Sequence, residues 1–317
     1  MKYEIKSLFT KFALSFFVFS FGCSEQRAWS APCCARSAAA PFLILTDDEA
    51  QIGLGVSAVD AVANVFEKAA FRPSGKTDFT NQYRVDGALL LSDRLQMGLS
   101  AAMVGRSVGS TVNPENNLGF GDTRLSLGYE YLPAWNYSAW KPQGFLFSVV
   151  TLPTGRSKFE LGSGDSKATV TGLGFYSVAL GSIFLKRWNV IDGFMIVEAH
   201  YSLPRTFGTA YDPQVVVPGL GGSAGFGLGW SPGGGNWRVG LRVQPRIDQV
   251  PTNNGIPEYL ALPRVISSCD TGFDLSYMLG NSQTIMMSYT DQTLLGYAAN
   301  TNLNRVLALN FQHRWER

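Results

Sequence analysis

A histidine and a serine two positions apart, His200 and Ser202, could form a catalytic pair. Side chains two residues apart on an extended strand point to the same face, so the imidazole could act as general base for the serine hydroxyl. A His-x-Ser pair also occurs frequently by chance on strands. Catalysis is therefore one hypothesis, and its value depends on the strand that carries the pair.

A second group of reactive side chains lies in residues 237–248, W-R-V-G-L-R-V-Q-P-R-I-D. The odd positions are apolar, whereas the even positions are polar, charged or glycine and include three arginines. Successive side chains of a strand alternate between its faces, so this segment predicts a strand with one apolar face and one cationic face. Charged side chains that line a pore can select ions by their sign.

The same alternation recurs in about twelve segments separated by turn residues. They lie near residues 51–58, 82–91, 95–105, 122–132, 144–154, 168–185, 190–202, 219–230, 237–248, 265–279, 283–292 and 304–315. The sixth has apolar residues on both faces, which leaves its register open. Long and short connections alternate along the chain, as they do in membrane barrels with long external loops and short periplasmic turns.

The composition agrees with this architecture. Charged residues make up 16% of the 317 residues, against roughly 25% in soluble proteins, while 34 glycines and 13% aromatic residues are present. The mean hydropathy is only +0.03, as expected where only alternate residues face lipid. The sequence therefore predicts an all-β protein, a membrane-spanning antiparallel up-and-down β-barrel of about 12 strands. The net charge of +2 and the lack of a basic cluster indicate no nucleic-acid partner.

The N-terminus resembles an export signal, with lysines before a short apolar run at residues 12–21. Cleavage before Ala31 would follow small residues, and an alternative is lipoprotein processing at Cys23. The predicted organisation is a signal peptide at 1–30, a periplasmic tail at 31–48 and an outer-membrane barrel at 49–317. The tail carries Cys33-Cys34, for which two interpretations remain open: a redox or tethering role, and a disordered tail whose thiols form disulfides with small thiols. Whether the tail plugs the barrel is also left open.

Two short motifs carry a resemblance to a known family. Residues 119–129, G-F-G-D-T-R-L-S-L-G-Y, and residues 152–156, L-P-T-G-R, resemble the outer-membrane barrels of the MetA-pathway phenol-degradation family. That resemblance implies a transporter or channel. The last strand, with Leu307, Leu309, Phe311 and Trp315 on one face, is similar to the C-terminal signal read by the barrel-assembly machinery. It departs from that signal in ending with Glu316-Arg317.

The expected function is a passive, porin-like channel or transporter for a small solute through a charged lumen, with outer-membrane lipid around it. We expect no cofactor and no metal. A plugged structural barrel is the first alternative. The second is a lipid hydrolase using His200 and Ser202, which is similar to outer-membrane phospholipase A but lacks that family's asparagine and arginine-glycine context. The predicted lumen residues are Arg84, Arg124, Glu130, Glu198, Arg238, Arg242, Arg246, Arg264 and Asp274, accompanied on the same face by Asp86, Asp122, Asp270 and Arg314.

Overall fold

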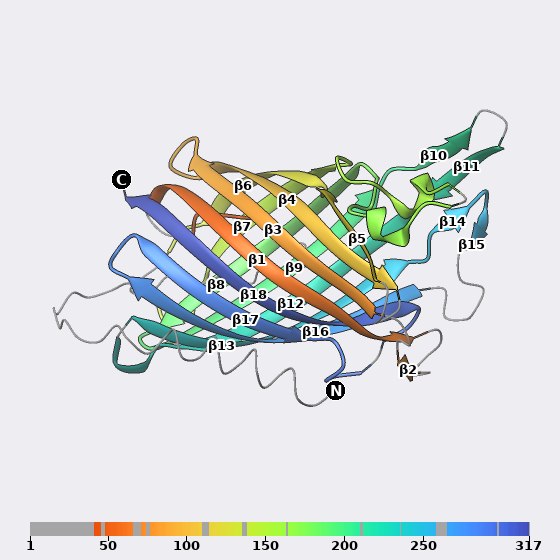
Figure 1. Ribbon diagram of the computed structural model, residues 1–317. Coiled ribbons are helices and arrows are strands. Elements are labelled where there is room, and N and C mark those ends of the chain that lie inside the picture. Colours follow the sequence, from red (N-terminus) through yellow and green to blue (C-terminus); the bar gives the residue numbers. More distant parts are fainter. Residues whose placement is uncertain are drawn as a thin grey trace, which may run out of the picture.

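The computed structural model describes residues 41–45, 48–65, 71–73, 77–109, 114–134, 138–162, 164–209, 212–234, 236–257, 265–296 and 298–316. Twelve long strands make up a closed antiparallel barrel (Figure 1). They are β1 (Asp48–Val65), β3 (Thr77–Leu90), β4 (Leu95–Gly109), β6 (Thr123–Leu132), β7 (Gln143–Leu152), β8 (Ser177–Trp188), β9 (Ile191–Ser202), β12 (Gly219–Trp230), β13 (Trp237–Gln249), β16 (Val265–Leu279), β17 (Gln283–Asp291) and β18 (Thr301–Glu316). The predicted fold class and strand number are confirmed.

Each strand of the barrel pairs with its neighbours in chain order, and β18 pairs with β1 to close the ring. The closing pair runs from Asp48 opposite Glu316 to Val65 opposite Thr301. Closure leaves no unpaired edge among these strands, which is a condition for a sheet that crosses a lipid bilayer. No helix in the described part of the chain is long and apolar enough to cross a membrane.

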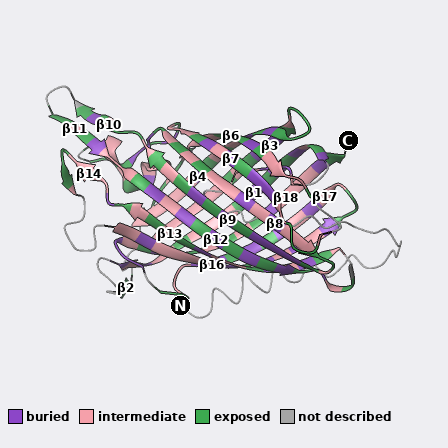
Figure 2. Cartoon of the chain, turned by 180° about the vertical axis from the view of Figure 1, so that it is seen from behind, coloured by how far each residue is buried: buried purple, intermediate pink, exposed green. Residues whose placement is uncertain are grey.

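The strands alternate between exposed apolar and buried side chains, as the sequence predicted. Figure 2 shows the alternation of burial as successive bands of exposed, intermediate and buried residues along the strands. On β13, Trp237, Leu241 and Ile247 point outward and are exposed, while Arg238 and Gln244 point inward and are buried. The exposed apolar set extends around the ring and includes Leu54, Val85, Leu99, Leu127, Leu180, Val197, Phe226, Phe273, Met287 and Leu307.

The two rims of the barrel differ. The short-turn rim carries the connections β3–β4, β6–β7, β8–β9, β12–β13 and β16–β17, together with the start of β1 and the end of β18. The opposite, long-loop rim carries β2 (Phe71–Pro73), β5 (Pro114–Phe120), and a small sheet of β10 (Arg205–Thr209), β11 (Asp212–Val217), β14 (Thr252–Asn253) and β15 (Ile256–Pro257). Figure 1 shows β10, β11, β14 and β15 projecting beyond the barrel at that rim.

The sixth strand is shorter at its start than predicted. Residues 168–185 were expected to be strand, but β8 begins only at Ser177, and a 3-10 turn occupies Lys167–Thr169. The residues between them serve the loop: the Leu173 amide donates to Asp122 Oδ2 at 2.7 Å. This side-chain acceptor replaces a ladder partner, so the apolar residues before Ser177 follow no strand alternation.

The two family-like motifs meet at the long-loop rim and hold each other. Asp122 of the first motif accepts a hydrogen bond from the Gly155 amide of the second at 3.1 Å. The Thr154 hydroxyl donates to the Gly121 carbonyl at 2.6 Å and accepts from the Thr123 amide at 3.0 Å. Asp122, which was expected to face the lumen, fixes the loop after β7 to the start of β6.

Candidate transport lumen

The three arginines of β13 all point into the barrel, as predicted, but their surroundings differ along its axis. Arg238 lies nearest the short-turn rim and is only 1% exposed. Arg242 lies four residues further along β13, toward the long-loop rim, and donates to the Thr290 hydroxyl at 2.7 Å. Arg246 lies toward the long-loop rim with its side chain 42% exposed. Of the three, Arg246 is therefore the one best placed to meet a passing ion.

Arg238 is neutralised by two aspartates on other strands. Its Nε and Nη2 atoms donate to both oxygens of Asp192 on β9 at 2.8 and 2.7 Å, and Nη1 donates to Asp274 on β16 at 2.6 Å. Between Arg238 and Asp192 lies β12, where Gly229 leaves the space: a Cβ there would approach the guanidinium to 2.3 Å. This bidentate ion triad is a structural part of the wall because water does not reach it.

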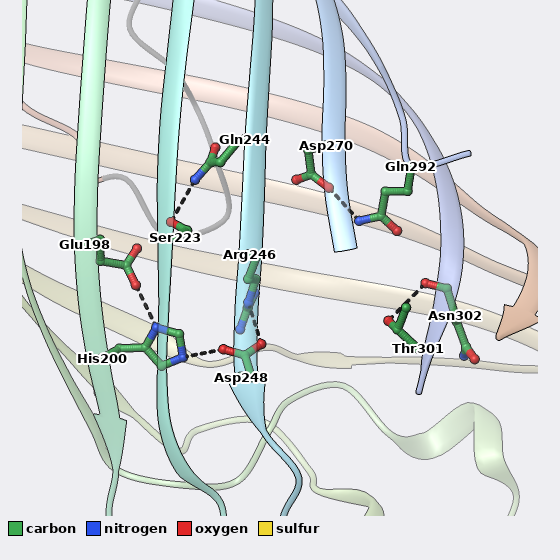
Figure 3. A network of polar contacts seen from close by, with 10 residues as sticks. All are labelled: Glu198, His200, Ser223, Gln244, Arg246, Asp248, Asp270, Gln292, Thr301 and Asn302. Atoms are coloured by element: carbon green, nitrogen blue, oxygen red, sulfur yellow. Dashed lines mark hydrogen bonds and ion pairs between the residues drawn. The ribbon is translucent and has the colours of Figure 1, made fainter. Parts of the chain in front are cut away.

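A chain of charged groups lies in the long-loop half of the lumen (Figure 3). His200 Nδ1 lies 2.7 Å from Glu198 Oε1, and His200 Nε2 lies 2.9 Å from Asp248 Oδ1. The second oxygen of Asp248 accepts from Arg246 Nε at 2.7 Å. The three strands involved, β9, β12 and β13, are adjacent, and the intervening Gly221 of β12 lets His200 pass over it.

Two more arginines extend this group across the lumen. Arg84 Nε on β3 lies 3.1 Å from Asp86 Oδ2. Arg124 on β6 interacts electrostatically with Arg84, Arg246 and Glu198, so charges on β3, β6, β9 and β13 influence one another here. We call this group the charged cluster; its members are Arg84, Asp86, Arg124, Glu198, His200, Arg246 and Asp248.

The remaining predicted lumen residues are separated from this cluster. Glu130 accepts from Gln143 Nε2 at 2.8 Å near the short-turn rim. Asp270 accepts from Gln292 Nε2 at 2.7 Å, and Arg314 donates to the Asn281 carbonyl at 3.0 Å. Arg264 lies outside the described residues. The alternation thus placed side chains on the correct face but could not say which of them meet.

The geometry does not assemble the proposed His200 and Ser202 pair. Both ring nitrogens of His200 face carboxylates, Glu198 on one side and Asp248 on the other. A general base needs a free ring nitrogen within hydrogen-bonding distance of the nucleophile. In this arrangement neither nitrogen is directed at the Ser202 hydroxyl.

One wall of the lumen is apolar, which the sequence reasoning missed. Its buried side chains come from three adjacent strands, β7, β8 and β9, and form one packed cluster. They are Phe145, Phe147, Val149, Ile183, Leu185, Phe194 and Ile196, and we call this set the apolar wall. The signal was present in the sequence, since the predicted sixth strand had apolar residues on both faces.

The apolar wall holds a segment of the chain that precedes the barrel. Leu43 belongs to the same packed cluster as the wall and is buried, as is Ile44. The Ile44 amide donates to Gln96 Oε1 at 2.5 Å, and Gln96 Nε2 donates back to the Ile44 carbonyl at 3.0 Å. Gln51 Nε2 donates to the Leu43 carbonyl at 2.7 Å. Residues 41–45 therefore lie inside the barrel, in its short-turn half.

Two glycines make room for this segment. A Cβ at Gly98 would lie 2.9 Å from the Phe42 carbonyl oxygen, and a Cβ at Gly128 would lie 2.6 Å from Leu43 Cδ2. Together with Gln51, Gln96 and the apolar wall they form the seat of residues 41–45. The predicted signal peptide and Cys33-Cys34 lie outside the described residues, so the signal peptide and the first part of the tail stay predictions. Residues 41–45 of the predicted periplasmic tail lie in the lumen instead.

Comparison with known proteins shows the fold. No family model and no curated protein matches the sequence. The COG4313 outer membrane channel from Pseudomonas putida F1 has 12% sequence identity and a TM-score of 0.64, over 86% of this chain and 100% of the channel. The NanC porin matches with 6% identity and a TM-score of 0.46, over 83% of this chain and 98% of the porin. A mutant of the TodX monoaromatic hydrocarbon channel matches with 10% identity and a TM-score of 0.44, over 86% and 91%. On the first of these likenesses, the chain has the fold of an outer-membrane β-barrel.

Proposed function

We propose that this chain is a passive channel of a bacterial outer membrane that passes small solutes through its lumen. The observation that carries the proposal is the division of the lumen. Its long-loop half holds charged side chains that water reaches, while its short-turn half is occupied by residues 41–45. A barrel that served only as a scaffold would have no need of a charged cluster in which water reaches Arg84 and Arg246, whose side chains are 24% and 42% exposed.

Location in a membrane is supported by the outer surface. Exposed apolar side chains surround the closed ring, and exposed aromatic residues lie at the short-turn rim, among them Trp188, Trp230, Trp237 and Trp315. Such aromatic belts lie at the level of lipid headgroups. In this orientation the short-turn rim faces the periplasm and the long-loop rim faces outward.

The test is electrical recording of the refolded full-length protein in planar bilayers. We expect discrete channel openings whose ion selectivity depends on the charged cluster. Replacing Arg246→Glu changes the lumen charge by two units and should shift the reversal potential in a salt gradient toward cations. Arg94→Glu, the same charge change on an exposed turn of the short-turn rim, is the control and should shift it less.

A silent barrel would count against the channel. Because residues 41–45 occupy the lumen, the decisive measurement is made on the wild type and on the double variant Gln51→Ala, Gln96→Ala. This variant loses the three hydrogen bonds that Gln51 and Gln96 make to Leu43 and Ile44. If folded protein of both kinds conducts no ions, the structural alternative is correct and the proposal is wrong. A heat-dependent shift in gel mobility identifies the folded barrel in each case.

A further inference from the structure

The seat of residues 41–45 has the features of a ligand-binding site and not of an ordinary packing interface. Ile44 offers its backbone N–H and C=O side by side, and one side chain, Gln96, meets both. Gln96 is 1% exposed and Ile44 is 2% exposed. A glutamine amide that pairs with the N–H and C=O of one residue in this way can pair likewise with a ligand that carries a donor and an acceptor side by side.

The rest of the seat is apolar. Leu43 packs in one cluster with Phe145, Phe147 and Ile183, and Gly128 leaves the space that the Leu43 side chain fills. Gln51, Gln96 and the seven residues of the apolar wall are all uncharged. A charged ligand would lose its hydration here without gaining an ionic partner from these side chains, which disfavours ions.

The seat also lies in line with the charged cluster. On β6 and β7, Arg124 is opposite Thr151, Ser126 is opposite Val149, and Gly128 is opposite Phe147. A solute that moves from the long-loop rim therefore passes Arg124 first. Two residues further along β6 it meets Val149 of the apolar wall, and four residues further it meets Gly128 of the seat. The segment occupies the place on this route where an apolar solute would gain most from burial.

We propose that this seat is a solute-binding site, and that Leu43 and Ile44 occupy it until a small neutral solute displaces them. The solute class is an apolar ring or chain that bears one adjacent donor and acceptor, such as a carboxamide. Binding removes the segment from the lumen, so the solute opens its own path. This inference rests on the proposed channel function.

The first experiment uses benzamide as the probe in planar bilayers. Toluene supplies the ring without the amide, and acetamide supplies the amide without the ring. We expect benzamide to increase the open fraction of the wild-type channel by about tenfold, the change that 1.4 kcal/mol produces, and both control compounds to increase it less. Equal effects of all three, or no effect of benzamide, would overturn the proposal.

The second experiment tethers the segment. Leu43→Cys and Gly128→Cys are combined in a chain whose own cysteines, Cys23, Cys33, Cys34 and Cys269, are replaced by serine. Shortening Leu43 removes the Cδ2 atom that the new Cβ at residue 128 would otherwise meet. The reduced channel should respond to benzamide and the oxidised one should not. An oxidised channel that responds as fully as the reduced one would show that the segment does not compete with the solute.

A matched variant separates this inference from the channel function. Gln51→Ala with Gln96→Ala should open the channel without benzamide, whereas Gln244→Ala should behave as wild type, because Gln244 is buried in the lumen but bonds to Ser223 of the barrel wall. If the double variant conducts and benzamide leaves the wild type unchanged, the seat proposal is wrong and the channel remains. If every variant is silent, the channel function itself is wrong.

Discussion

The apolar wall and the wall formed by β12, β13 and β16 are built from the same kind of strand but do different work. The apolar wall presents phenylalanine, isoleucine, leucine and valine to the lumen, and these side chains pack against residues 41–45, which precede β1 in the chain. The neighbouring wall of β12, β13 and β16 presents Arg238, Asp274 and Gln244, whose polar groups are bonded within the barrel. The apolar wall can thus pack against another group, whereas the polar groups of the other wall largely pair with one another.

The two walls meet at β12, whose inward positions are glycines except for Ser223. A Cβ at Gly227 would lie 2.4 Å from Phe194 Cε1 of the apolar wall, and one at Gly229 would meet Arg238. Side chains from β9 and β13 therefore occupy the space that these glycines leave, and the two walls pack against each other over β12.

The largest loss of stability is expected when the buried ion triad of Arg238 is disrupted. Arg238→Ala leaves Asp192 and Asp274 buried without their cation, which costs about 3–5 kcal/mol of unfolding free energy. Arg246→Ala removes an arginine whose side chain is 42% exposed, and its ion pair with Asp248 is worth only about 0–1 kcal/mol. Urea unfolding of the protein refolded in vesicles measures both.

A third variant keeps the Arg238 prediction testable if Arg238→Ala fails to fold. Arg238→Met with Asp192→Asn and Asp274→Asn removes all three charges together and should recover much of the loss, since no unpaired buried ion remains. Equal stability of Arg238→Ala and Arg246→Ala would mean that the triad is hydrated and that the two halves of the lumen do not differ.

A smaller change in stability distinguishes the packed apolar wall from the lipid-facing surface. Ile196 is 0% exposed and Ile191, on the same strand, points outward with 47% exposure. Ile196→Val leaves a small void among fixed neighbours and should cost about 0.5–1.5 kcal/mol. Ile191→Val should cost at most about a few tenths, because mobile lipid chains, as apolar as leucine, fill the space. Unfolding midpoints that fall equally would contradict a packed lumen wall.

Alternation made most of the barrel predictable from the sequence. A period of two is a local property, so residues 237–248 could be assigned an apolar outer face and a cationic inner face from their order alone. Which inward side chains meet depends on register and shear between strands far apart in the chain. No local sequence pattern predicts the Arg238 triad or the electrostatic interaction of Arg124 with Arg246.

The segment inside the barrel shows the same limit. Pro41 to Leu45 is five residues long, too short for any periodicity, and its partners Gln51 and Gln96 look like ordinary polar positions on strands. Apolar residues on both faces of the sixth predicted strand were a signal of an apolar lumen, but the same pattern also fits a strand of uncertain register. Tertiary contact alone distinguishes the two interpretations.

The smallest effect concerns an ion pair outside the barrel, between Asp165 and Arg156. Solvent screens this pair, whereas the triad of Arg238, Asp192 and Asp274 is buried. Asp165 accepts from the Gly162 amide at 3.0 Å and from Arg156 Nη2 at 2.6 Å. The Gly162 hydrogen bond and then the Arg156 charge lower the pKa of the Asp165 carboxyl below its ordinary value. A lowered folded-state pKa means that this contribution to loop order is present above the ordinary carboxyl pKa and is lost as the pH falls through the lowered value.

Hydrogen exchange of the loop amides measures this contribution when wild type and Asp165→Asn are compared at the same pH, which cancels the intrinsic effect of acid on exchange. Well above the ordinary carboxyl pKa of roughly 4, the Gly162 amide should exchange more slowly in the wild type than in the variant. Well below it, the two rates should converge, while amides of β9 around the buried Glu198 stay as protected as before. A ratio that does not change with pH would show that the Asp165 charge contributes nothing to the loop, and the contrast between paired charges inside and outside the barrel would then rest on burial alone.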